Sequence, residues 1–67
     1  MTRNDALQVI ILTMIKEFKT PPSINDILIR FSQTTIRLYH YELTRLIWKM
    51  TELNLITVRS GLIYPIT

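Results

Sequence analysis

Apolar residues recur at steps of three and four along most of this chain, which is the spacing of one helical face. In the first segment these apolar residues are interspersed with charged and polar residues. The segment is followed by Lys19-Thr20-Pro21-Pro22. Proline lacks the amide proton that a helix interior needs, so the helix must end there. The pattern therefore predicts a helix over about 4–18, capped by Thr2 or Asn4. Its apolar face consists of Leu7, Ile10, Ile11, Met14, Ile15 and Phe18.

A second helix is predicted over about 23–32. Ser23 and Asp26 have the spacing of a capping box, in which a hydroxyl and a carboxylate accept the free amides of a helix start. The apolar face that follows is Ile24, Ile27, Leu28 and Phe31. The polar residues Gln33, Thr34 and Thr35 then interrupt the pattern.

The third and longest periodic segment predicts a helix over about 35–53. Its expected buried stripe is Ile36, Tyr39, Leu43, Leu46, Met50 and Leu53, with Ile47 beside it. Asn54 follows this stripe, and asparagine tolerates the left-handed conformation that closes many helices.

From Leu55 the apolar residues alternate instead, which predicts a β-hairpin over about 55–66. Ser60-Gly61 as a two-residue loop pairs Arg59 with Leu62, Val58 with Ile63, Thr57 with Tyr64 and Ile56 with Pro65. We expect Ile56, Val58 and Ile63 to share one face. Because an isolated hairpin is marginal in water, that face should pack on the helices.

Composition fits one small packed domain covering residues 1–67. Hydrophobic residues make up 48% of the chain, and eleven residues are isoleucine. The chain has no cysteine, so neither disulfides nor thiolate metal sites are expected. No apolar run approaches the roughly 18 residues that span a bilayer, so we expect no membrane association. We expect a cytoplasmic location, either associated with the nucleoid or, if the protein is viral, in the cytoplasm of the host cell.

Catalysis and cofactor binding are not expected either. The chain has one histidine, one glycine and five scattered carboxylates. It therefore offers no cysteine nucleophile, no phosphate-binding glycine loop and no set of metal-ligand side chains beyond scattered carboxylates.

Positive charge is concentrated in the C-terminal part. Arg3, Lys16 and Lys19 are balanced by three carboxylates in residues 1–29, whereas five basic residues oppose only Glu42 and Glu52 in residues 30–67. A basic half favours a polyanionic partner, although a solvated surface has the same composition.

The order helix, short helix, polar turn, long helix, hairpin resembles the winged helix-turn-helix family of DNA-binding domains. The most specific stretch is Leu46 to Ile56, LIWKMTELNLI, which is similar to the family's leucine-spaced helix ending in Glu-x-Gly-Leu-Ile before the wing. Asn54 replaces the usual glycine, and the turn before the third helix lacks the glycine often found there. The resemblance implies a transcriptional regulator that binds double-stranded DNA, similar to small regulators of archaea and their viruses or plasmids.

A helical projection of the third helix places donor-rich side chains opposite its apolar stripe. Residues near the start of such a helix usually reach the bases, so Arg37, Tyr41 and Thr44 are candidates for base contacts, with Arg45 and Lys49 nearer the phosphates. The predicted DNA-binding set also includes Gln33, Thr34 and Thr35 in the turn, His40 at the edge of the third helix, and Arg59 and Ser60 at the hairpin bend.

Several of these residues have a second interpretation. Arg45 and Lys49 lie three residues from Glu42 and Glu52, so ordinary surface ion pairs also explain them. His40 fits a surface position without a site. Trp48 is compatible with a DNA sugar contact, with packing under the wing or with a subunit interface.

A homodimer is expected as well. Val9 and Leu12 point away from the core face of the first helix, and Leu62, Tyr64 and Ile66 share the outer face of the hairpin, so either surface is a candidate interface. Regulators that resemble this chain often form two-fold dimers matching palindromic sites. The alternative function is a protein–protein interaction module without DNA binding, because fold does not fix function. A membrane-surface role for the first helix is disfavoured by its acidic residues.

Overall fold

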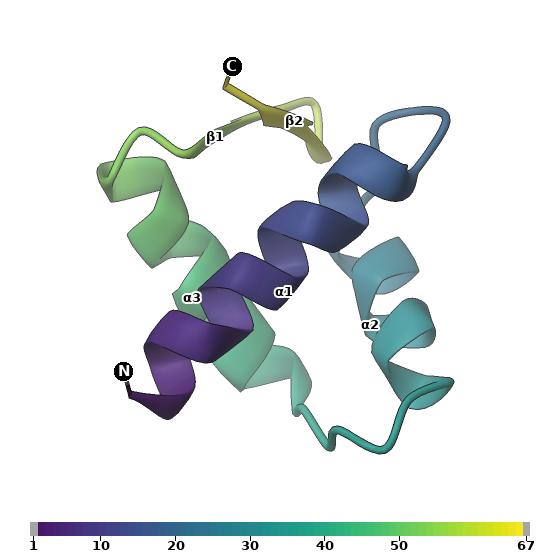
Figure 1. Cartoon of the computed structure of the whole chain (residues 1–67). Coiled ribbons are helices and arrows are strands. Elements are labelled where there is room, and N and C mark those ends of the chain that lie inside the picture. Colours follow the sequence, from purple (N-terminus) through teal and green to yellow (C-terminus); the bar gives the residue numbers. More distant parts are fainter. Residues whose placement is uncertain (1, 67) are drawn as a thin grey trace.

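The computed structural model describes residues 2–66 and has three helices followed by a two-stranded antiparallel hairpin (Figure 1). The elements are α1 (Arg3–Glu17), α2 (Ile24–Ser32), α3 (His40–Glu52), β1 (Ile56–Arg59) and β2 (Leu62–Pro65). The predicted fold class, mainly helical with a small C-terminal hairpin in a winged-helix layout, is confirmed.

Local hydrogen bonds set the start of the first two helices. Thr2, one of the two expected caps, accepts from the Asp5 amide at 3.1 Å, and the Asp5 carboxylate accepts from the Thr2 amide at 3.4 Å. Ser23 and Asp26 make the same reciprocal pair at 3.2 and 3.0 Å. Both helices therefore begin with capping boxes, as the sequence predicted for α2.

The third helix differs most from its prediction, because it begins at His40 and not near residue 35. The Thr34 hydroxyl donates to the Phe31 carbonyl at 2.7 Å and accepts from the Ile36 amide at 3.2 Å. These local bonds satisfy backbone groups that a helix would otherwise use. Residues 33–39 therefore form an irregular connection, and Arg37 lies in it, before the helix.

The end of α3 confirms the predicted role of Asn54. This residue has φ 59°, and its amide donates to the Thr51 carbonyl while the Leu55 amide donates to the Met50 carbonyl, at 3.0 and 2.9 Å. The two bonds are those of a Schellman motif, in which a left-handed residue reverses the chain and satisfies the last carbonyls. The chain turns there into the hairpin.

The hairpin has the predicted register, with Ile56 opposite Pro65 and Arg59 opposite Leu62. Ser60 and Gly61 both have positive φ, at 52° and 76°, as a two-residue primed turn requires. Outside the strands, the Ile66 amide also donates to the Leu55 carbonyl at 3.0 Å. Ile56 and Ile63 are buried, but Val58 is 41% exposed, so the expectation that Val58 closes the core is wrong. Val58 lies next to the bend, where the hairpin extends past the helices.

A single hydrophobic cluster joins every element. The buried members among residues 2–66 are Leu7, Ile11, Met14, Ile15, Ile27, Phe31, Leu43, Leu46, Ile47, Met50, Ile56 and Ile63. Two residues of the predicted α3 stripe are not among them: Tyr39 is 64% exposed and Leu53 is also exposed. Both lie outside the helix, Tyr39 as its N-cap and Leu53 as its C-cap, so helical periodicity does not apply to them. Ile36 and Leu38, in the preceding connection, still pack against the cluster.

The left-handed cap gives a stability prediction. Asn54→Ala should lower the free energy of unfolding by about 1 kcal/mol, because a Cβ without a compensating local hydrogen bond is unfavourable at positive φ. Asn54→Gly is the matched control and should be neutral or stabilising. Urea denaturation followed by circular dichroism measures both, and equal stability of the two variants would contradict the proposed role of backbone conformation.

Candidate nucleic-acid interface

The N-terminal end of α3 is held in place by one arginine from α1. The Arg3 guanidinium lies 3.1 Å from Glu42 Oε2 and also donates to the Arg37 carbonyl at 3.3 Å. The other oxygen of Glu42 accepts from the Tyr39 amide at 3.3 Å, which caps the first turn of α3. Arg3 therefore fixes both the connection that carries Arg37 and the first turn of the helix.

The outward side of α3, defined here as Tyr41, Thr44, Arg45, Trp48 and Lys49, faces away from the buried Leu43, Leu46, Ile47 and Met50. Thr44 is half-buried and the other four side chains are exposed. Trp48 is 69% exposed, so the wing does not cover it. The structure thus brings together four of the predicted DNA-binding residues and Trp48 on one helix surface.

The basic residues on this side are not neutralised by neighbouring carboxylates. In the described part of the chain the ion pairs within 4.0 Å are Arg3–Glu42 and Arg30–Glu17. Glu42 is therefore engaged by α1 and not by Arg45, and Lys49 has no ion pair with Glu52. The alternative in which ordinary surface ion pairs account for Arg45 and Lys49 is not what the structure shows.

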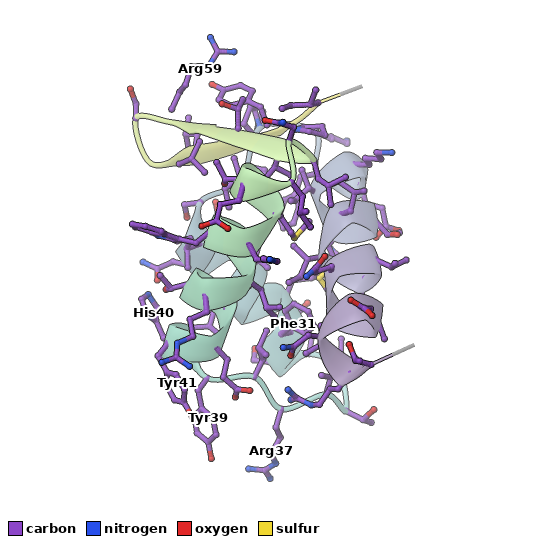
Figure 2. All side chains as sticks on the ribbon, turned by 90° about the vertical axis from the view of Figure 1, so that its left-hand side faces the viewer. Phe31, Arg37, Tyr39, His40, Tyr41 and Arg59 are labelled. Carbon is purple, nitrogen blue, oxygen red and sulfur yellow. The ribbon has the colours of Figure 1, made fainter. Side chains whose placement is uncertain are left out.

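Two tyrosines extend the outward side toward the start of the helix. The rings of Tyr39 and Tyr41 stack with centroids 5.8 Å apart and an interplanar angle of 10°. Figure 2 shows both tyrosine side chains at the lower end of α3, with His40 projecting to the same side above them. Sequence reasoning missed Tyr39 because the three-and-four spacing assigned it to the core. The signal that identifies it as a cap, Glu42 three residues later, was present in the sequence.

Two of the predicted hydroxyl contacts already have structural partners. Thr44 donates to the His40 carbonyl at 2.9 Å, and Thr34 donates to the Phe31 carbonyl. Their hydroxyl protons are used, so these side chains offer a ligand an acceptor oxygen and a methyl group. Gln33, Thr35 and Arg37 are exposed in the connection, and His40 is exposed at the first position of α3.

The wing carries its arginine at a different end of the molecule. Arg59 lies over the ring of Tyr64, with 5.1 Å between the guanidinium carbon and the ring centroid, and Ser60 is exposed in the adjacent turn. In Figure 2 Arg59 and Arg37 project from opposite ends of the molecule. The two predicted contact regions therefore flank α3 along its length and do not form one cluster.

The residues predicted for a dimer interface lie on α1 and on the hairpin, where Ile66 is exposed just after β2. Val9 is 56% exposed on α1 and Leu12 beside it is half-buried. Leu62 and Tyr64 are half-buried on β2, and Arg59 covers one face of the Tyr64 ring.

Comparison with known proteins gives no match, whether with family models, with curated proteins or with solved structures. Within residues 2–66, no three His, Asp or Glu side chains are grouped so that they could hold a metal ion. No helix of this range is long and apolar enough to cross a membrane. The geometry of α3 and its surroundings is therefore the main basis for a functional interpretation.

The Arg3 contacts give a second prediction. Arg3→Ala should lower stability by about 0.5 to 1 kcal/mol, as expected for a partly exposed pair with one added hydrogen bond. It should also increase amide exchange of residues 39–43, because Glu42 loses the partner that orients its cap. Hydrogen exchange followed by mass spectrometry measures the local effect.

Arg30→Ala is the matched control, because its ion pair with Glu17 spans 4.0 Å and joins α1 to α2. Faster exchange at the start of α3 in both variants would mean that Arg3 has no special role there.

Proposed function

We propose that the chain binds double-stranded DNA sequence-specifically and acts as a transcriptional regulator, with α3 in the major groove and the wing on the backbone or in the adjacent minor groove. An α-helix fits the major groove, where base pairs present distinguishable patterns of donors and acceptors. No catalytic step is part of this proposal.

The observation that carries the proposal is the outward side of α3, where Arg45 and Lys49 are exposed and free of ion pairs in the described chain. Cations without carboxylate partners are available to replace the counterions of DNA phosphates. Tyr41 lies in the first turn of α3 and Arg37 in the connection just before it, at the end that approaches base edges in helix-turn-helix proteins. A rigid helix with positive charge along it and donors at its tip has the chemistry of duplex recognition.

The wing supports the same proposal. Arg59 extends from the hairpin and lies over the ring of Tyr64. This contact already restricts the rotamers of the arginine, so less side-chain entropy is lost when the arginine binds. An arginine held in this way is suited to a phosphate or to a narrow minor groove.

A protein–protein interaction module is the second candidate function, and the 69% exposure of Trp48 favours it. Tryptophan is enriched at the centres of protein interfaces. The two functions differ in their response to salt: DNA binding weakens steeply as salt rises, whereas a tryptophan-centred protein contact changes little.

The phosphate contacts of α3 can be tested by the salt dependence of binding. A duplex is first selected from a random pool, and its affinity is then measured by fluorescence anisotropy at several salt concentrations. Arg45→Ala and Lys49→Ala should each reduce the slope of log K against log salt by about 0.9 and weaken all duplexes alike. Lys19→Ala, in the loop between α1 and α2, is the control and should leave the slope unchanged. Unaltered binding by both α3 variants would refute the proposed docking of α3.

Base contacts and wing contacts should differ in their effect on specificity. Arg37→Ala should reduce the preference for the selected duplex over single-base variants by about tenfold to a hundredfold at one position, because a bidentate base contact is lost. Arg59→Ala should lower the affinity for every duplex by the same factor, so that the ranking of the duplexes by affinity does not change. A competition assay with the set of single-base duplexes measures both, and a change of specificity in Arg59→Ala alone would reverse the assigned roles.

A further inference from the structure

A stripe on α1 has a self-complementary order of residues. Asp5, Val9, Leu12 and Lys16 follow one another at steps of four, three and four, so they lie on one line along the helix. This line faces away from the buried Leu7, Ile11, Met14 and Ile15. Its two apolar side chains are central, with an acid at the N-terminal end and a base at the other end.

The stripe has little role within the monomer. Val9 is 56% exposed, and Leu12 is half-buried at the edge of the core. Lys16 is exposed and forms no ion pair within 4.0 Å in residues 2–66. Asp5 uses one carboxylate oxygen to cap α1 at 3.4 Å, which leaves its other oxygen available.

We infer that α1 is a homodimer interface in which two copies pair antiparallel through this stripe. A two-fold axis between residues 10 and 11 places Asp5 of one copy opposite Lys16 of the second copy, and Val9 opposite Leu12. The contact has two ion pairs around four apolar side chains, and both copies use the same surface, as two-fold symmetry requires. A parallel arrangement would instead place like charges together, so the order of the charges selects the antiparallel pair.

The outer face of the hairpin lacks this property. Residues 55–66 contain Arg59 and no acidic residue, so two hairpins that met face to face would gain no charge complementarity. Arg59 also covers one face of Tyr64. Of the two surfaces, α1 is therefore the one whose chemistry identifies a second copy as its partner.

The α1 stripe adjoins the outward side of α3 at one end, because Asp5 lines a surface hollow with Arg45 and Lys49. In Figure 2 Tyr39, His40 and Tyr41 project from the side of the molecule away from the pale purple ribbon of α1.

The test of the dimer needs no DNA, so its failure is distinguishable from failure of the proposed function. One helix face gives a small interface, for which we expect a dissociation constant between about 10 μM and 1 mM. Sedimentation equilibrium over this range should show a monomer–dimer equilibrium. Val9→Gln should weaken association at least about tenfold, whereas Ile29→Gln, at an exposed isoleucine of α2, should leave it unchanged. A monomer at about 1 mM, or an equal effect of both variants, overturns the inference.

Charge reversal tests the antiparallel register. Lys16→Glu alone and Asp5→Lys alone should each be monomeric, because both create like-charge contacts, and mixing them should restore a heterodimer. Circular dichroism verifies folding, since Asp5 also caps α1. If Asp5→Lys does not fold, Asp5→Asn retains an oxygen for the cap and should weaken association about as much as Lys16→Gln. Dimers of Lys16→Glu as stable as the native ones would refute the register.

Discussion

Burial of the hairpin against the helices is the constraint on which the rest of this structure depends. Two strands alone are marginal in water, and here Ile56 and Ile63 enter the same cluster as the helices. The Ile63 amide also donates to the carbonyl of the buried Pro22 at 2.8 Å, which ties the loop after α1 to the hairpin. Figure 1 shows the hairpin lying across the ends of α1 and α3. A chain of 67 residues gains a common core only because every element contributes to it.

This packing also determines which surface is available for a partner. Because α3 buries Leu43, Leu46, Ile47 and Met50, it must present its polar side to solvent. The Arg3 contact engages Glu42, the acid three residues before Arg45 in α3, and Glu42 forms no ion pair with Arg45. Stability and the proposed function are therefore linked: the ion pair that fixes the start of α3 also leaves Arg45 without Glu42 as a partner.

The α1 stripe and the α3 surface serve separate purposes in this interpretation. One is short, with opposite charges at its ends, and fits a copy of itself. The other is net positive, with aromatic and donor groups, and fits a polyanion. Association and DNA binding can be measured independently, because sedimentation of the free protein needs no DNA.

The sequence by itself determined the number, order and type of the elements, the Ser23 capping box, the Asn54 cap and the hairpin register. These features arise from residues within a few positions of one another, and local physical chemistry fixes them. It also identified most of the candidate site, because the outward side of α3 follows from the helical period of its core residues. The pairing of Glu42, and with it the free state of Arg45, was decided by tertiary structure, because it depends on Arg3, which is 39 residues away in sequence. The start of α3 depends on this contact and also on the bonds of Thr34, which are local but compete with the helix that the apolar spacing predicts. The spacing of apolar residues predicts which face of a helix is buried. It carries no information on the long-range contacts that determine where the helix begins.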